Sequence, residues 1–176
     1  MPARQIPMPK VWLVSDERND AVLARAIRRL PRGSGVIFRH FHLPPRQWRA
    51  RLRTVKALCR SRGHMLIVAG PPAQARCVGA AGSYGPPVPH RTLANVHSFR
   101  EVGRANALGA DAIVLSPVFA TRSHPGSRPL GAICALLLAR RARVPVIALG
   151  GMTAARFRQL GRAGIFAGWA AIDGLS

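Results

Sequence analysis

Acidic residues and cysteines are scarce in this sequence. Among 176 residues, 6 Asp plus Glu face 27 Lys plus Arg, which gives a formal charge of +21. The three cysteines, Cys59, Cys77 and Cys134, lie far apart in predicted helices. This spacing favours neither a disulfide framework nor a CxxC metal site, so we expect them in the core. With 48% apolar and 19% charged residues, the chain is too hydrophobic for a disordered polycation.

Long hydrophobic segments and several well-known motifs are also missing. No apolar stretch reaches the roughly 18 residues of a membrane span, and residues 1–10 lack the apolar centre of a signal peptide. No Gly-x-Gly-x-x-Gly follows the first apolar run, and neither a P-loop nor a zinc-protease motif is present. We therefore expect one cytoplasmic domain over residues 1–176, with residues 1–10 as a flexible or strand-leading N-terminus and no membrane partner.

The positive charge is almost entirely arginine, since Lys10 and Lys56 are the two lysines. Arginine favours phosphate and other planar anions, although a GC-rich genome gives the same bias. The arginines fall in clusters on four predicted helices: Arg25, Arg28, Arg29 and Arg32; Arg46, Arg49, Arg51 and Arg53; Arg140, Arg141 and Arg143; Arg156, Arg158 and Arg162. We interpret this as charge spread over several outer faces rather than one stripe. It predicts adventitious binding to polyanions at low salt and no specific nucleic-acid partner.

Short apolar runs alternate with helical stretches along the whole chain. The runs are expected strands at 11–14, 35–38, 65–68, 93–96, 111–115, 144–149 and 168–172, with a shorter one inside the Gly- and Pro-rich segment 79–89. Because these runs do not alternate with polar residues, they fit parallel strands covered on both faces. A doubly wound sheet and a (β/α)8 barrel both satisfy this pattern, and 176 residues is short for the barrel.

Ligands of parallel α/β proteins bind at the carboxyl ends of the strands. Gly150 and Gly151 follow one apolar run, and Thr153 then opens a helix. Glycines let backbone N–H groups approach an oxyanion, and a helix N-terminus favours negative charge. The segment is therefore either a phosphate site or a plain glycine turn.

Two further segments after strands carry polar side chains. Ser116 opens a long loop, 117–129, where Thr121, Ser123 and His124 either close over an anion or are simply solvated. His97 follows a strand directly and precedes Ser98, which with Glu101 forms a helix-capping pattern. A histidine there either exchanges protons near neutral pH or bonds a neighbouring carbonyl.

Three segments together resemble the thiamine phosphate synthase and thiazole tautomerase (TenI-like) family. They are Asn95-Val-His-Ser98, Gly109-Ala-Asp-Ala-Ile-Val-Leu-Ser-Pro-Val-Phe-Ala-Thr121 and Val144-Pro-Val-Ile-Ala-Leu-Gly-Gly-Met152. The resemblance is specific from about residue 93 to 173 and loose before that. It implies a compact (β/α)8 TIM barrel, shortened and with a degenerate fourth strand, and a role in thiamine metabolism.

The resemblance also implies roles for single residues. Arg39 matches a basic residue that contacts the diphosphate substrate in this family, and His97 matches the acid/base histidine of the tautomerases. The remaining assignments are Ser116, Thr121, Ser123 and His124 for substrate binding, and Gly150, Gly151 and Gly168 for phosphate binding. A thiazole phosphate is the implied ligand.

The family's synthases join a pyrimidine diphosphate to a thiazole phosphate with the help of Mg²⁺, whereas its tautomerases move a proton on a thiazole carboxylate phosphate. The segments that match the synthase metal ligands, 67–71 and 80–90, contain no Asp or Glu. We therefore expect no metal held by the protein's own residues, with Mg²⁺ needed only by a true synthase, and we favour metal-free proton transfer. The alternatives are a genuine synthase and a non-catalytic barrel that binds phosphate or a polyanion, and a homo-oligomer is compatible with each.

Overall fold

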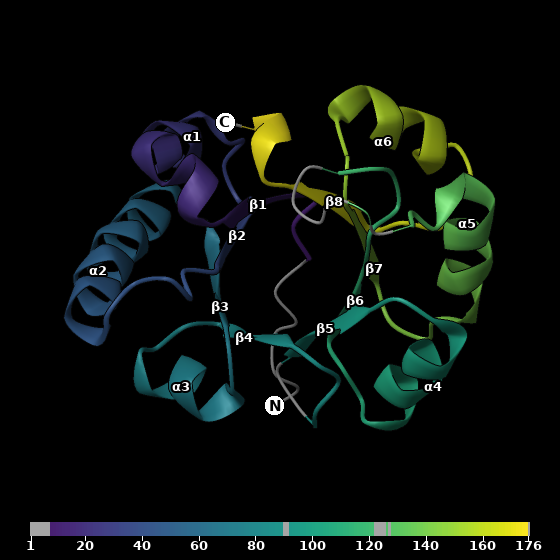
Figure 1. Ribbon diagram of the computed structural model, residues 1–176, viewed down its shortest axis with the longest axis horizontal. Coiled ribbons are helices and arrows are strands. Elements are labelled where there is room, and N and C mark those ends of the chain that lie inside the picture. Colours follow the sequence, from purple (N-terminus) through teal and green to yellow (C-terminus); the bar gives the residue numbers. More distant parts are fainter. Residues whose placement is uncertain (1–7, 90–91, 122–125, 127, 176) are drawn as a thin grey trace.

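The computed structural model describes residues 8–89, 92–121, 126 and 128–175, and within them eight parallel strands close into a barrel (Figure 1). The strands are β1 (Val11–Ser15), β2 (Gly35–Phe38), β3 (Met65–Ala69), β4 (Gly82–Gly85), β5 (Thr92–Val96), β6 (Ala112–Leu115), β7 (Val146–Leu149) and β8 (Gly168–Ala171). Each strand pairs with the next along the chain. The pairing of β1 with β8, with Val11 opposite Trp169, closes the ring. The closed ring confirms the barrel and removes the doubly wound alternative.

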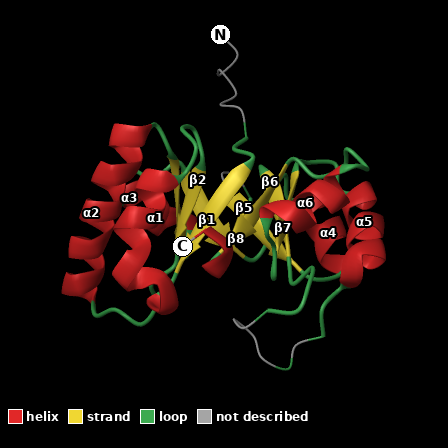
Figure 2. Cartoon of the chain, turned by 90° about the horizontal axis from the view of Figure 1, so that it is seen from above, coloured by secondary structure: helices red, strands yellow, loops and turns green. Residues whose placement is uncertain are grey.

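Helices surround the strands as an outer layer (Figure 2). They are α1 (Leu23–Arg29), α2 (Pro45–Arg62), α3 (Pro72–Cys77), α4 (Phe99–Ala107), α5 (Gly131–Arg141) and α6 (Ala154–Gly161), with two 3-10 helices, η1 (Glu17–Val22) and η2 (Asp173–Leu175). The described residues between β4 and β5, 86–89, form no helix, and β8 leads into η2 alone. The short connection after β4 and the short end after β8 explain how 176 residues complete a barrel.

Both faces of the strands are buried, as the continuous apolar runs predict. Residues that point inward, such as Trp12, Ile37 and Ile147, fill the centre of the barrel. Their neighbours Leu13 and Phe38 pack outward beneath the helices. Parallel strands covered on both sides have no solvent face, and polar alternation is therefore absent from their sequences.

Two of the helices begin with side-chain caps directly after the strands that carry candidate site residues. The Ser98 hydroxyl accepts a hydrogen bond from the Glu101 N–H at 3.3 Å, and the Thr153 hydroxyl accepts one from the Arg156 N–H at 3.2 Å. These bonds satisfy N–H groups that have no partner inside the helix. They fix the chain at the carboxyl ends of β5 and β7, where the site lies.

The cysteines agree only in part with the expectation of a core position. Cys59 is buried, Cys134 is half-buried and Cys77 is exposed near the end of α3. The six residues of α3 present only Ala75 to the core, which leaves the Cys77 side chain outside. None of the described helices is both long and apolar enough to cross a membrane.

Candidate functional site

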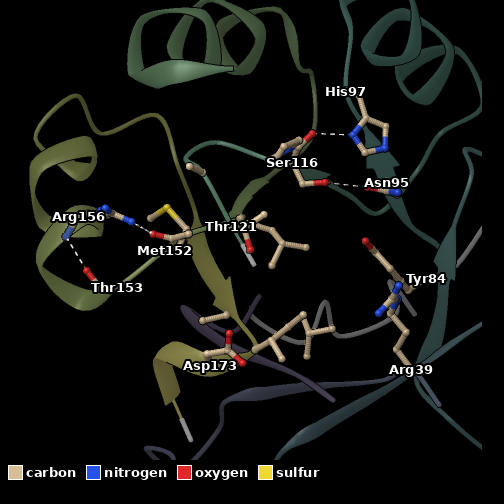
Figure 3. A pocket seen from close by; sticks show the side chains of 18 of the residues that line it. Arg39, Tyr84, Asn95, His97, Ser116, Thr121, Met152, Thr153, Arg156 and Asp173 are labelled. Carbon is tan, nitrogen blue, oxygen red and sulfur yellow. Dashed lines mark hydrogen bonds between the residues drawn. The ribbon is translucent and has the colours of Figure 1, made fainter. Parts of the chain in front are cut away.

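A cavity of about 720 Å³ opens at the carboxyl ends of the strands (Figure 3). Its described lining includes six of the residues predicted from the sequence, namely Arg39, His97, Ser116, Thr121, Gly150 and Gly151. Ser123 and His124 lie outside the described residues. The structure therefore gathers into one cavity side chains from β2, β5, β6 and β7 that are far apart in the sequence.

Gly150 and Gly151 form a turn that lies against the loop after β6. Their φ angles are +96° and +59°, a region that glycine enters freely. A Cβ on Gly150 would lie 2.6 Å from the Pro117 Cα, and one on Gly151 would overlap the Ala120 carbonyl oxygen. The Phe119 N–H also donates to the Gly150 carbonyl at 3.0 Å. The two glycines thus serve the contact between two loops, and they place backbone without side chains at the cavity wall.

Arg156 adds a cation beside this turn. Its guanidinium donates to the Gly151 carbonyl and lies 5.1 Å from the centre of the Phe119 ring. Sequence reasoning placed Arg156 in a surface cluster and missed it as a site residue. The signal that identifies it is its position three residues after the capping Thr153, which turns the side chain back toward the strand end.

A hydrogen-bonded group from β5 and β6 holds His97. The His97 Nδ1 lies 2.6 Å from the Ser116 carbonyl oxygen, and the Ser116 hydroxyl donates to the Asn95 side-chain oxygen at 3.2 Å. The His97 backbone N–H donates to the Glu101 carboxylate at 2.6 Å. Because a carbonyl only accepts, Nδ1 carries the proton, and Nε2 of the neutral ring holds the lone pair. The ring therefore makes the structural bond and still presents a basic nitrogen.

Arg39 and Tyr84 lie across the cavity from Arg156 (Figure 3). The Arg39 guanidinium is 3.6 Å from the Asp16 carboxylate and 5.6 Å from the centre of the exposed Phe41 ring. Burial raises the pKa of Tyr84 to about 12, although the positive charge of Arg39 acts in the opposite direction. The phenol therefore stays protonated at neutral pH and can donate a hydrogen bond to an anion.

Asp173 brings a carboxylate to the cavity wall after β8. The Arg18 guanidinium lies 3.7 Å from it and also donates to Asp16 at 2.8 Å, so a cation faces both acids. Among the residues the structure describes, no group of three or more His, Cys, Asp or Glu side chains converges in metal-binding positions.

Gly168 lies apart from the other residues predicted to bind phosphate. Gly168 is the first residue of β8 and therefore lies at the amino end of the barrel, away from the cavity. A Cβ there would lie 2.6 Å from the Lys10 carbonyl oxygen, so this glycine allows β8 to approach the segment before β1.

Comparison with known proteins gives matches to one family over the second half of the chain. Residues 94–175 match the family model described as thiamine monophosphate synthase. A putative thiamine-phosphate synthase 2 of Aquifex aeolicus (strain VF5) is 41% identical over 59 residues, which are 34% of this chain and 32% of that protein. The match thus spans about a third of the length of this curated relative.

Solved structures show the same barrel over nearly the whole chain. A thiamine phosphate pyrophosphorylase from Pyrococcus furiosus superposes with a TM-score of 0.77 at 21% identity, covering 95% of this chain and 87% of that one. One from Bacteroides thetaiotaomicron gives 0.58 at 15% identity, covering 94% and 82%. A KDPG aldolase from Legionella pneumophila gives 0.57 at 16% identity, covering 94% and 84%. At these identities the likeness shows the fold.

Proposed function

Because residues 94–175 belong to the thiamine phosphate synthase/TenI-like family, we propose that the chain binds a phosphorylated thiazole in its cavity and transfers a proton on the ring. The observation that carries this proposal is the hydrogen bond from His97 Nδ1 to the Ser116 carbonyl, which leaves Nε2 as a base. Proton transfer needs a positioned acid/base and no co-reactant.

The phosphate is assigned to the turn after β7. The Thr153 hydroxyl caps the Arg156 N–H, so the N–H groups of Ala154 and Ala155 at the start of α6 have no partner within the helix. Together with the N–H groups of Gly150 and Gly151, they offer donors to phosphate oxygens at the positive end of the helix dipole. The Arg156 guanidinium supports this end with a full charge.

A second anionic group of the ligand is assigned to the opposite wall. Arg39 and the protonated Tyr84 phenol offer a charged and a neutral donor there. A ligand with a phosphate at one end and a carboxylate at the other matches the donors on these two walls of the cavity. The Asp173 carboxylate lines the same cavity and disfavours a further anion at β8.

His97 carries the chemistry in this proposal. Nε2 removes a proton from one position of the thiazole ring, and the resulting imidazolium returns a proton at another position. No bond to a leaving group breaks and no electrons are exchanged with a co-reactant. The Ser116 carbonyl stabilises the imidazolium because it accepts the Nδ1 proton in both protonation states.

The residues present do not fit a Mg²⁺ ion held by the protein, which the family's synthases imply. The chain after β3 reads Gly70-Pro71-Pro72, and the described lining of the cavity has one carboxylate, Asp173, which Arg18 faces at 3.7 Å. Hard divalent cations need several oxygen ligands. We therefore route no step through a metal.

The test follows a thiazole carboxylate phosphate in D₂O by proton NMR, with EDTA and with Mg²⁺. We expect tautomer conversion that does not depend on Mg²⁺. His97→Gln should lower its rate by about 10²–10⁴-fold, the usual contribution of a general acid/base, while ligand affinity stays within a few-fold. His42→Gln, an exposed histidine outside the described lining, is the matched control.

Each of the other outcomes contradicts the proposal in a different way. Release of pyrophosphate from a pyrimidine diphosphate, dependent on Mg²⁺, would identify a synthase. Tight binding without conversion in the wild type would identify a non-catalytic barrel. Equal rates for wild type and His97→Gln would remove His97 from the chemistry.

A further inference from the structure

Five cations recur on α2 at intervals of three or four residues. We call them the α2 stripe: Arg46, Arg49, Arg53, Lys56 and Arg60. At 3.6 residues per turn they fall within about 80° of the helix circumference. All five are exposed, whereas Leu52, Val55 and Cys59 on the other side are buried. The α2 stripe therefore faces solvent at the periphery of the molecule, where Figure 1 shows α2 at the left.

None of these five cations has a counter-charge among the described residues. Lys56 donates to the Val78 carbonyl at 2.6 Å, but no hydrogen bond or ion pair joins the side chains of the four arginines of the α2 stripe to any described residue. Arg51 points elsewhere and takes Asp20 at 2.7 Å. The sequence of α2 contains no Asp or Glu. The arginines of the chain still lie on several outer faces, but on α2 five cations share one of them.

The spacing of the α2 stripe makes it a straight row. Fourteen residues separate Arg46 from Arg60, which at 1.5 Å per residue is about 21 Å. Like charges three or four residues apart repel and weaken an isolated helix. A partner that supplies a row of negative charges removes this repulsion, and counterion release then favours binding.

The types of residue on the exposed face of α2 favour some anionic partners over others. The planar arginine fork matches phosphate oxygens better than a lysine does. The exposed positions between the cations are small or polar: Gln47, Ala50, Thr54 and Ala57. A membrane-surface helix needs bulky apolar residues at such positions, and single-stranded nucleic acid needs aromatic side chains for base stacking. A rigid double helix needs neither.

We propose that the α2 stripe is a docking surface for the phosphate backbone of double-stranded nucleic acid, independent of base sequence. Duplex DNA carries one negative charge per about 1.7 Å of its axis when both strands are counted, so about 21 Å of duplex carries roughly twelve phosphates, of which those on the near side face the α2 stripe. The four unpaired arginines can each find a phosphate within that length. This surface lies on a peripheral helix, and the proposal is independent of the cavity chemistry.

The test measures fluorescence anisotropy of a labelled 20-base-pair duplex with full-length protein between 50 and 200 mM salt. Four phosphate contacts predict a log–log slope of about −3.6, or about 150-fold weaker binding across that range. The stripe variant is Arg46→Gln, Arg49→Gln, Arg53→Gln and Arg60→Gln. The control variant removes the same charge from other exposed sites: Arg140→Gln, Arg141→Gln, Arg143→Gln and Arg158→Gln.

We expect the stripe variant to lose at least 50-fold in duplex affinity at 50 mM salt and most of its salt slope, while the control variant stays within about threefold of the wild type. Equal losses in the two variants would show that net charge alone attracts the duplex, and would overturn the proposal. So would unchanged binding by the stripe variant, or a preference for vesicles of phosphatidylserine and phosphatidylcholine over the duplex. Unchanged melting temperatures and far-ultraviolet circular dichroism spectra verify that both variants fold.

Discussion

Replacing Gly151 by Ala tests whether the two loops at the cavity wall depend on this turn. The φ angle of Gly151 is +59°, and its new Cβ would overlap the Ala120 carbonyl oxygen. An L-residue in the left-handed region costs about 1–2 kcal/mol, and forcing an extra carbon into a packed contact costs about 1–3 kcal/mol. The two costs together predict a loss of about 2–5 kcal/mol in the free energy of unfolding.

A matched glycine separates the two costs. Gly164 has a φ angle of +66°, and a Cβ added there would meet nothing within 4 Å, so Gly164→Ala carries the backbone cost alone. We therefore expect Gly164→Ala to lose about 1–2 kcal/mol. At about 2–4 °C per kcal/mol for a chain of this size, the contact adds roughly 2–12 °C to the fall in melting temperature of Gly151→Ala.

The assay is thermal unfolding, with and without inorganic phosphate as the probe. Phosphate that binds the folded turn raises the melting temperature of the wild type and of Gly164→Ala. It should not raise that of Gly151→Ala, in which the turn must shift. Equal melting temperatures for the two variants would refute the loop contact. An equal phosphate effect in the two variants would refute the assignment of phosphate to this turn.

Two further predictions concern titration and charge. Burial lowers the pKa of His40 below its ordinary 6.5, with Asp20 opposing the shift, so the unfolded chain binds the proton more readily between the lowered pKa and 6.5. Stability should therefore fall as the pH drops below about 6.5, and His40→Leu should flatten this part of the profile of urea midpoints. Asp173→Asn removes a carboxylate from the cavity wall and should tighten inorganic phosphate binding about fivefold in calorimetry, as expected for roughly 1 kcal/mol of repulsion; unchanged affinity would mean that Arg18 already neutralises this acid.

The barrel could be predicted from the sequence because its strands have a simple physical signature. Runs such as the one ending at Leu115 are apolar without alternation, which is what burial on both faces requires. β4 reads Gly-Ser-Tyr-Gly and has no such run, so only its place in the alternation indicates it. Its pairing with β3 and β5, not its own propensity, makes it a strand.

The candidate site could be predicted wherever a residue directly follows a strand. His97, Ser116 and Gly150 are of this kind, since the carboxyl ends of all strands meet at one edge. Arg156 and Tyr84 were missed for different reasons. Arg156 reaches the turn from inside a helix, and Tyr84 belongs to the strand with the weakest sequence signal. Both residues reach the cavity because of the direction of their side chains, which the order of residues alone does not give.

Gly168 and the α2 stripe both show that the role of a residue depends on its position in space as well as on its type. The expected strand 168–172 already begins at Gly168, and the register with Ile147 agrees that this glycine lies at the amino end of β8, outside the described lining of the cavity. In α2, the spacing of three or four residues between the cations is visible in the sequence. Grouping Arg51 with Arg46, Arg49 and Arg53 obscures this spacing. The helical period places Arg51 on another side of α2, where it pairs with Asp20 at 2.7 Å. Composition counts charges, whereas a binding surface depends on which of them share a face and lack a partner.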